Sequence, residues 1–368
     1  MQKEERLDYL DGLKGLFTIL VVLGHFNMMF NKSGFVGWGT TYVDPKSVFF
    51  ENLPWSLFIN NTLPLYLFMA LIAFFPAYKY FKKKDNKSLI RSSILRYFRF
   101  VPMVFVGCLI SYLLYRFELY CFDDYINLTG NMWVSQNASY SFTFLDVFKD
   151  GLLLGYLRGT QMISSLWCLN YLFLGSLLSY VFVYIVGNVK HRGWVYLGIA
   201  MIFLVIDPTY LSFISGVGVA DMVCNSELVN NKKVMILFFI VGIIIGLCPE
   251  VLMPSWLNIL VVEAISEFFI LTGIAGLFSK SKFLNNKLLT NIGKMSFALI
   301  IVHILVLFTV AGYIYIWLNG LNVPSTINFV ITFISFAIIS LIASDIYNKV
   351  LTSLTGKICF KVIEALKL

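Results

Sequence analysis

Long apolar runs separated by short polar turns dominate this chain. In lipid, only α-helices and closed β-barrels satisfy the backbone hydrogen bonds, and a barrel would show short alternating strands. The runs here are continuous and of membrane-spanning length. The pattern therefore predicts an all-α, polytopic integral membrane protein with about ten transmembrane helices. The ten predicted spans are 13–31, 57–78, 94–115, 165–187, 192–206, 208–224, 234–248, 255–279, 295–318 and 326–347.

The fifth, sixth and seventh of these segments are shorter than the others, and a longer stretch, 116–164, separates the third from the fourth. That stretch contains the sequence FTFLDVFKDGLLLGYL. We expect a helix lying at the membrane interface there. No repeat or low-complexity linker divides the chain, so 1–368 is predicted to form one transmembrane domain.

Composition supports the same class of protein. The chain is 59% hydrophobic and 13% charged, with a mean hydropathy of +0.80, which is far from the usage of soluble proteins. Its six cysteines are scattered and none forms a CxxC pair or a Cys/His cluster. Neither a zinc site nor a redox pair is indicated, and no metal is expected.

The basic residues predict the orientation of the spans. If ten helices cross the membrane, all but five of the 28 Lys and Arg residues lie on the side of the N-terminus. The positive-inside rule then places both termini in the cytoplasm of a multi-pass protein of the plasma or inner membrane. The net charge of +8 is thus explained by orientation and by contact with the lipid bilayer, and we expect no nucleic-acid partner.

Ionisable residues inside a membrane are costly, so each one marks a candidate functional site. The predicted spans contain His25, Glu263, Glu267 and His303. Lys14 precedes His25 by eleven residues, which is about three helical turns, so both lie on one face, roughly 16 Å apart along the axis. That face suits a substrate with an anionic group at the cytoplasmic end and a reacting group inside the membrane. A core histidine with a lysine extending to the interface would explain the same spacing.

Glu263 and Glu267 are four residues apart and share a face of the eighth span. We expect them at the depth of His25, where Glu263 would orient the imidazole as the third group of a catalytic triad does. An ion pair with a basic residue elsewhere in the bundle is the alternative. His303 would either take part in the same site or pack in the core.

Four motifs resemble those of the membrane-bound acyltransferase family 3. LDGLKGLFTILVVLGH resembles its opening motif, in which a basic residue precedes a histidine by eleven positions. RYFRFVP (96–102) resembles its Arg-x-x-Arg and proline segment, and SSLWCLNYLF resembles the segment that begins the fourth span. NIGKMSFALIIVH (291–303) resembles its late IGxxSYxxYLxH element. The motifs occur in the family's order and cover the chain from end to end.

The resemblance implies a membrane acyltransferase that moves an acyl group, usually acetyl, from cytosolic acetyl-CoA or another acyl-CoA onto a carbohydrate hydroxyl. His25 would be a general base or a transient acyl carrier. Lys14, Arg96, Arg99 and His303 would bind CoA, and the arginines suit its phosphates. Trp167, Ser164 and Ser165 would bind a glycan or a lipid-linked sugar.

Departures from the family pattern leave the acceptor open. The second span reads LYLFMALIAFF where many members have FFVLSGF, and Leu172 stands where a glutamate often follows the tryptophan motif. These residues include no fused hydrolase-like domain, so we expect direct transfer or transfer through envelope-assembly partners. A transporter or flippase of a polysaccharide precursor is the main alternative from another class, and a non-catalytic membrane component is a third.

Overall fold

The computed structural model describes residues 8–30, 62–248, 258–278 and 281–367. This described part of the chain is helical and contains no strand. Each predicted span falls largely on helical residues over its described part, although the fourth begins in a turn and the third and tenth are parts of longer helices. Residue 31, residues 57–61, 255–257 and residue 279 lie outside the described residues. The helices are α1 (Asp8–Phe30), α4 (Thr62–Lys83), α5 (Asn86–Arg116), η3 (Tyr171–Gly175) with α10 (Ser176–Val186), α11 (Gly193–Ile206), α12 (Leu211–Asn225), α13 (Lys232–Gly246), α14 (Ile259–Leu277), α16 (Ser296–Val306) with η7 (Leu307–Ala311) and α17 (Gly312–Gly320), and α18 (Ser325–Leu366).

Six helical segments of the described chain are both long and apolar enough to cross a membrane. The chain is therefore a multi-helix membrane protein, while the count of ten spans and the side of the termini stay predictions. Helices α10 to α13 are shorter, with 11 to 15 residues each. The six segments are α1, α4, α5, α14, Ser296–Gly320 and α18.

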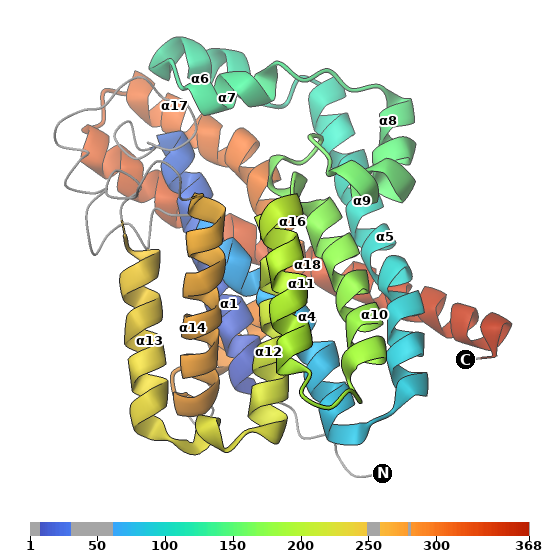
Figure 1. The fold of residues 1–368 in the computed structure, drawn as a ribbon. Coiled ribbons are helices and arrows are strands. Elements are labelled where there is room, and N and C mark those ends of the chain that lie inside the picture. The colour runs from blue at the N-terminus through green and yellow to red at the C-terminus, as the bar shows by residue number, and fades with distance from the viewer. Residues whose placement is uncertain (1–7, 31–61, 249–257, 279–280, 368) are drawn as a thin grey trace.

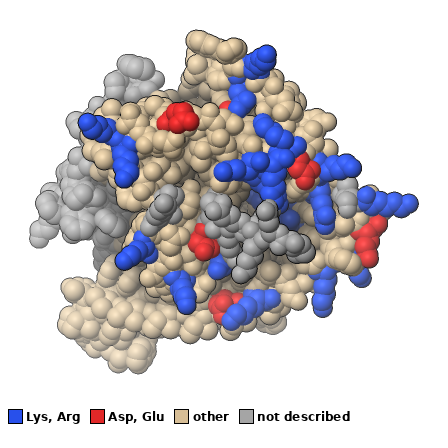
Figure 2. Space-filling view, turned by 90° about the horizontal axis from the view of Figure 1, so that it is seen from below, with Lys and Arg blue, Asp and Glu red and all other residues tan. Residues whose placement is uncertain are grey.

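The two ends of the bundle differ in character (Figure 1). At one end lie the first turn of α1 and the connection from α4 to α5, where the residues from Lys79 to Arg99 are rich in lysine and arginine. Figure 2, seen from below, shows Lys and Arg side chains gathered over this end. We call it the basic end. The long helix α18 runs obliquely across the bundle, and its last turns extend beyond α5.

Short helices cover the opposite end, which we call the capped end (Figure 1). They come from the stretch 116–164, and residues 144–158 form a nearly continuous helix over FLDVFKDGLLLGYLR, as the pattern predicted. The helices are α6 (Phe122–Thr129), α7 (Met132–Ala138), α8 (Phe144–Lys149), η1 (Asp150–Leu154) and α9 (Gly155–Arg158).

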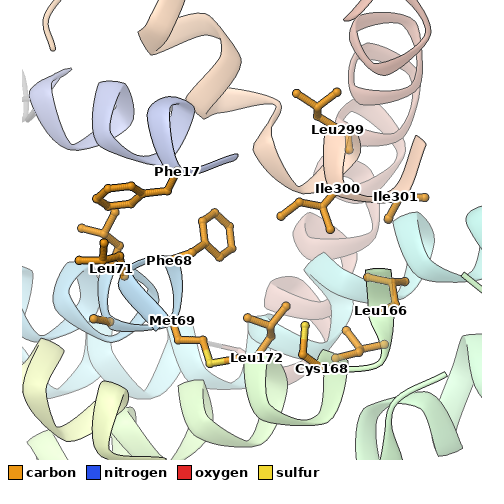
Figure 3. Close-up of a cluster of buried hydrophobic side chains, with 14 of the residues drawn as sticks. Phe17, Phe68, Met69, Leu71, Leu166, Cys168, Leu172, Leu299, Ile300 and Ile301 are labelled. Atoms are coloured by element: carbon orange, nitrogen blue, oxygen red, sulfur yellow. The ribbon is translucent and has the colours of Figure 1, made fainter. Parts of the chain in front are cut away.

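The apolar core lies where α1, α4 and α16 meet the segment that leads into α10 (Figure 3). Phe17 comes from α1, Phe68 and Met69 come from α4, and Leu299 and Ile300 come from α16. All five side chains are at least 95% buried. This core fixes α1 and α16 side by side, which matters because each carries one of the buried histidines.

Glycines bring the two ends of the chain into backbone contact. Helix α1 packs closely on α15 (Lys287–Lys294), the short helix before α16. A Cβ atom on Gly12 would lie 1.8 Å from the Leu284 carbonyl oxygen, and one on Gly293 would lie 1.8 Å from the Asp11 carbonyl oxygen. Only glycine allows this approach. Gly12 of the opening motif and Gly293 of the late motif are thus both required where α1 crosses α15.

We expect Gly293→Ala to lower the thermal unfolding midpoint of the purified protein, because the added methyl group must push α15 away from α1. Overpacking of this kind costs about 1–3 kcal/mol. Gly198→Ala in α11 is the matched control, since a Cβ there meets no described atom within 4 Å. Equal unfolding midpoints for the two variants would contradict the close crossing.

Candidate active site

Two histidines from opposite ends of the chain meet inside the bundle. His25 lies on α1 and His303 on α16, and their side chains are 91% and 100% buried. His303 Nε2 lies 3.2 Å from His25 Nδ1, and the ring centroids are 5.1 Å apart. The motifs that open and close the family pattern therefore contribute to one site.

The backbone fixes which ring nitrogens carry hydrogen. His303 Nδ1 lies 2.7 Å from the Leu299 carbonyl oxygen, and His25 Nδ1 lies 3.0 Å from the Val21 carbonyl oxygen. A carbonyl oxygen only accepts, so both Nδ1 atoms must donate. The single His25 Nδ1–H is then shared between the Val21 carbonyl oxygen and His303 Nε2 as a three-centre hydrogen bond, and the second nitrogen of His25, Nε2, carries a lone pair. This is the protonation state that a base or a nucleophile requires.

The capped end covers this pair from above. The indole of Trp133, on α7, lies 5.9 Å from the His25 ring between centroids and 5.1 Å from Phe308. Asn131 donates its side-chain amide to the carbonyl oxygens of Met28 and Met29, at 2.9 and 3.0 Å. These bonds tie the start of α7 to the last described turn of α1. The bonds hold Trp133 over His25.

Lys14 lies three turns below His25 on α1, as the spacing predicted. Its ammonium group pairs with Asp11 Oδ1 at 2.9 Å and lies 4.3 Å from the centroid of the Phe75 ring on α4. Asp11 is 8% exposed and belongs to the same motif. No role was predicted for Asp11 from the sequence. The structure shows that it holds Lys14 at the basic end of α1.

Arg96 and Arg99 lie in the first half of α5, toward the basic end. The Arg96 guanidinium stacks on Phe100 at 4.7 Å, and its Nε donates to Ser176 Oγ on α10 at 3.0 Å. Arg96 is half-buried between the two helices, whereas Arg99 is exposed. The two arginines are therefore near neighbours with different surroundings, and Arg96 is the one held in a fixed position.

The predicted acceptor residues lie between α9 and α10, around the 3₁₀ turn η2 (Ser164–Leu166). Ser165 is buried, and its hydroxyl donates to the Ile300 carbonyl oxygen on α16 at 2.6 Å. This bond joins η2 to the helix turn before His303. Ser164 is half-buried and Trp167 is 40% exposed, with its ring packed edge-on against Tyr171. Trp167 therefore presents part of its indole at the surface.

Glu263 and Glu267 lie on α14, which packs against α13, α12 and α4, whereas α1 packs against α15, α4 and α16. Glu263 is 1% exposed. Glu267, on the next turn, accepts a hydrogen bond from Ser215 on α12. The orienting role of Glu263 beside His25 stays a prediction. The described contacts of His25 are made by Val21, His303 and Trp133.

Sequence reasoning identified His25 and Lys14 because their spacing puts both on one helical face. Trp133 was not predicted, because a tryptophan in a seven-residue helix outside the predicted spans carries no periodic signal. Among the described residues, no three His, Cys, Asp or Glu side chains are grouped as metal ligands.

Comparison with protein families matches residues 7–348 to the acyltransferase domain of the acyltransferase 3 family. Comparisons with curated proteins and with solved structures gave no match. The matched range covers nearly the whole chain and includes all four motifs and the histidine pair. The resemblance seen in the sequence is confirmed, and the chain belongs to the acyltransferase 3 family of membrane proteins.

Proposed function

We propose that this protein transfers an acyl group, most simply acetyl, from cytosolic acyl-CoA to a hydroxyl of a cell-surface carbohydrate or lipid-linked sugar, in the plasma or inner membrane. The observation that carries the proposal is the buried pair of His25 and His303, whose hydrogen bonds leave the lone pair on His25 Nε2. Family membership supports the reaction class.

His25 Nε2 acts as the base. It takes the proton of the acceptor hydroxyl while that oxygen attacks the thioester carbonyl carbon. The C–S bond then breaks, and the imidazolium returns its proton to the CoA sulfur, so that an ester and CoA leave. In the variant mechanism, Nε2 attacks the thioester carbonyl carbon and the C–S bond breaks, so that CoA leaves as a thiolate. The acceptor hydroxyl then attacks the acyl group on Nε2, the N–C bond breaks, and the hydroxyl proton goes to the CoA sulfur. Both routes use the same lone pair.

His303 and the backbone support the charge that develops on His25. When Nε2 takes a proton, the positive imidazolium still donates Nδ1–H toward Val21 O and His303 Nε2. Hydrogen bonds to a charged group are stronger than those between neutral groups. His303 is therefore a positioning residue in this mechanism, and the orienting role predicted for Glu263 stays a prediction.

The two substrates approach from opposite ends of the bundle. The donor enters at the basic end, where Lys14, Arg96 and Arg99 offer positive charge to the CoA phosphates. The acceptor enters at the capped end, where Trp133 lies over His25 and the indole of Trp167 is partly exposed. An exposed indole suits the apolar face of a sugar ring.

Turnover of acetyl-CoA by the purified protein tests the function. We expect slow hydrolysis of acetyl-CoA in the absence of an acceptor and faster release of CoA with one. Mass spectrometry of surface glycans from cells with and without the gene would identify the acceptor by loss of an acyl group. A protein that neither binds nor consumes acyl-CoA, but moves a polysaccharide precursor across vesicles, would contradict the proposal.

The arginines give a separate prediction about donor binding. Arg96→Ala is expected to raise the apparent KM for acyl-CoA by about 10- to 100-fold, as the loss of charge-assisted hydrogen bonds worth about 1.5–3 kcal/mol implies. Arg99→Ala should raise it less, because Arg99 is exposed. Steady-state kinetics with varied donor and saturating acceptor measures this. A change confined to the acceptor KM would rule out a donor role.

A further inference from the structure

The indole of Trp133 covers the imidazole of His25 from the capped end. The two ring centroids are 5.9 Å apart, and the ring planes are inclined by 34°. Trp133 is half-buried, whereas His25 is 91% buried. Helix α7, which carries the indole, lies at the capped end and packs on α1 (Figure 1). A group that approaches His25 from the capped end therefore meets Trp133.

Phe308 extends this apolar cover. It lies in η7, the continuation of α16, and is 3% exposed. Its ring centroid is 5.1 Å from that of Trp133 and 5.1 Å from that of Phe122 on α6. Aromatic rings thus follow one another from His25 to α6. Such rings offer few hydrogen bonds to a water molecule, so water gains little by standing among them.

Hydrogen bonds fasten the cap to both helices that carry the histidines. On α1, the carbonyl oxygen of Met29 accepts from the Tyr125 hydroxyl and, at 3.0 Å, from the side-chain amide of Asn131. On η7, the carbonyl oxygen of Phe308 accepts from the Cys121 backbone N–H at 2.9 Å. The position of the indole over the imidazole is therefore fixed by α1 and by the continuation of α16.

We propose that Trp133 determines whether the acyl group passes to a sugar or to water. The inference rests on the proposed function and deepens it. In the competing hydrolysis, His25 Nε2 takes a proton from water while the water oxygen attacks the thioester carbonyl carbon. The C–S bond breaks and the proton passes to the CoA sulfur, so that acetic acid and CoA leave. Trp133 suppresses this route by keeping water from Nε2.

A sugar gains from the indole what water does not. The apolar face of a sugar ring packs on an aromatic ring, and this contact offsets the cost of entering a site without water. A water molecule has no apolar face and loses hydrogen bonds at the same place. Excluding water from a closed site is a general means of preventing hydrolysis. Trp133 is therefore assigned as a specificity-determining residue on the acceptor side.

Hydrolysis of acetyl-CoA by the full chain in nanodiscs tests the assignment, because it needs no acceptor. We expect Trp133→Ala to release CoA about 10-fold faster than the wild type, a usual contribution of an apolar pocket to discrimination. Trp133→Phe keeps an apolar ring and should lie between the two. Trp317→Ala is the matched control, since Trp317 is 63% exposed on α17. Equal rates for Trp133→Ala and Trp317→Ala would overturn the proposal.

Asn131→Asp tests the same claim with the indole in place. Its carboxylate can still accept from the Val134 backbone N–H, as Asn131 Oδ1 does at 3.0 Å, so α7 keeps its N-cap. The carboxylate cannot donate to the carbonyl oxygens of Met28 and Met29. We expect faster hydrolysis in this variant too, because the cap is released from α1. An unchanged rate in a well-folded Asn131→Asp variant would overturn the proposal.

Modification of histidine by diethyl pyrocarbonate gives a readout that does not depend on turnover. Mass spectrometry follows His25, with exposed His191 as the internal reference. We expect His25 to react slowly in the wild type and faster in Trp133→Ala. Faster modification without faster hydrolysis would overturn the role against water. Absence of acetyl-CoA consumption in the wild type and in every variant would refute the proposed function itself. Equal consumption by all of them would refute the assignment of Trp133 alone.

Discussion

His25→Ala is expected to assemble normally and to lose acyl transfer by about 10²–10⁴-fold, the usual effect of removing a general base. The side chain is in the core, but alanine preserves the helix and leaves α1 packed on α15 and α4. The loss should appear in kcat, since the Nε2 lone pair acts on the reacting atoms. Single-turnover transfer from labelled acyl-CoA measures the chemical step directly.

His191→Ala is the control for His25→Ala. His191 is exposed in the turn before α11 and is the one histidine of the chain's three that lies outside the pair of His25 and His303. Its replacement should leave transfer unchanged. Near-normal turnover by a well-folded His25→Ala variant, judged by the same elution profile and unfolding midpoint as the wild type, would refute the role of His25 as base and as acyl carrier.

His303→Phe is expected to lower kcat by about 10- to 100-fold, because His25 Nδ1–H loses the acceptor that helps to stabilise its charged form. Donor KM should change little if His303 acts through His25. The carbonyl oxygen of Val21 remains in place, so some activity should persist. The measurement is the separate determination of kcat and donor KM.

His303→Gln distinguishes positioning from packing. Its amide oxygen can accept from His25 Nδ1–H, so part of the lost kcat should return relative to His303→Phe. A merely structural histidine would show equal losses in the two variants, accompanied by equal losses of thermal stability. A rise in donor KM with unchanged kcat would instead place His303 on the donor path and would contradict the positioning role.

The sequence predicted the helices well because lipid imposes a simple rule. A run of about twenty apolar residues must form a helix, and each predicted span lies on one. The spacing of Lys14 and His25 predicted their common face for the same reason. Helices such as α11 and α12 are shorter than the 18 residues expected of a membrane-spanning helix. Whether they cross the membrane therefore remains a prediction.

The partners of the site residues were harder to predict, because they depend on how the helices pack. The surroundings of Glu263, for example, depend on α14, which packs against α13, α12 and α4. His303 pairs with His25 because Gly12 and Gly293 let α15 dock on α1, which a list of ionisable residues does not show. Trp133 reaches His25 through hydrogen bonds of the cap to the end of α1.

The most direct test of the central claim is to measure from which side of the membrane the acyl-CoA donor is consumed. The protein is placed in either orientation in the membrane of sealed vesicles that enclose an acceptor sugar. Labelled acetyl-CoA is then added only to the outside. We predict that label reaches the acceptor only in vesicles whose outer surface exposes the basic end, and not with His25→Ala. Equal labelling in both orientations, or labelling that persists in the His25 variant, would contradict a buried histidine served by CoA from the basic end.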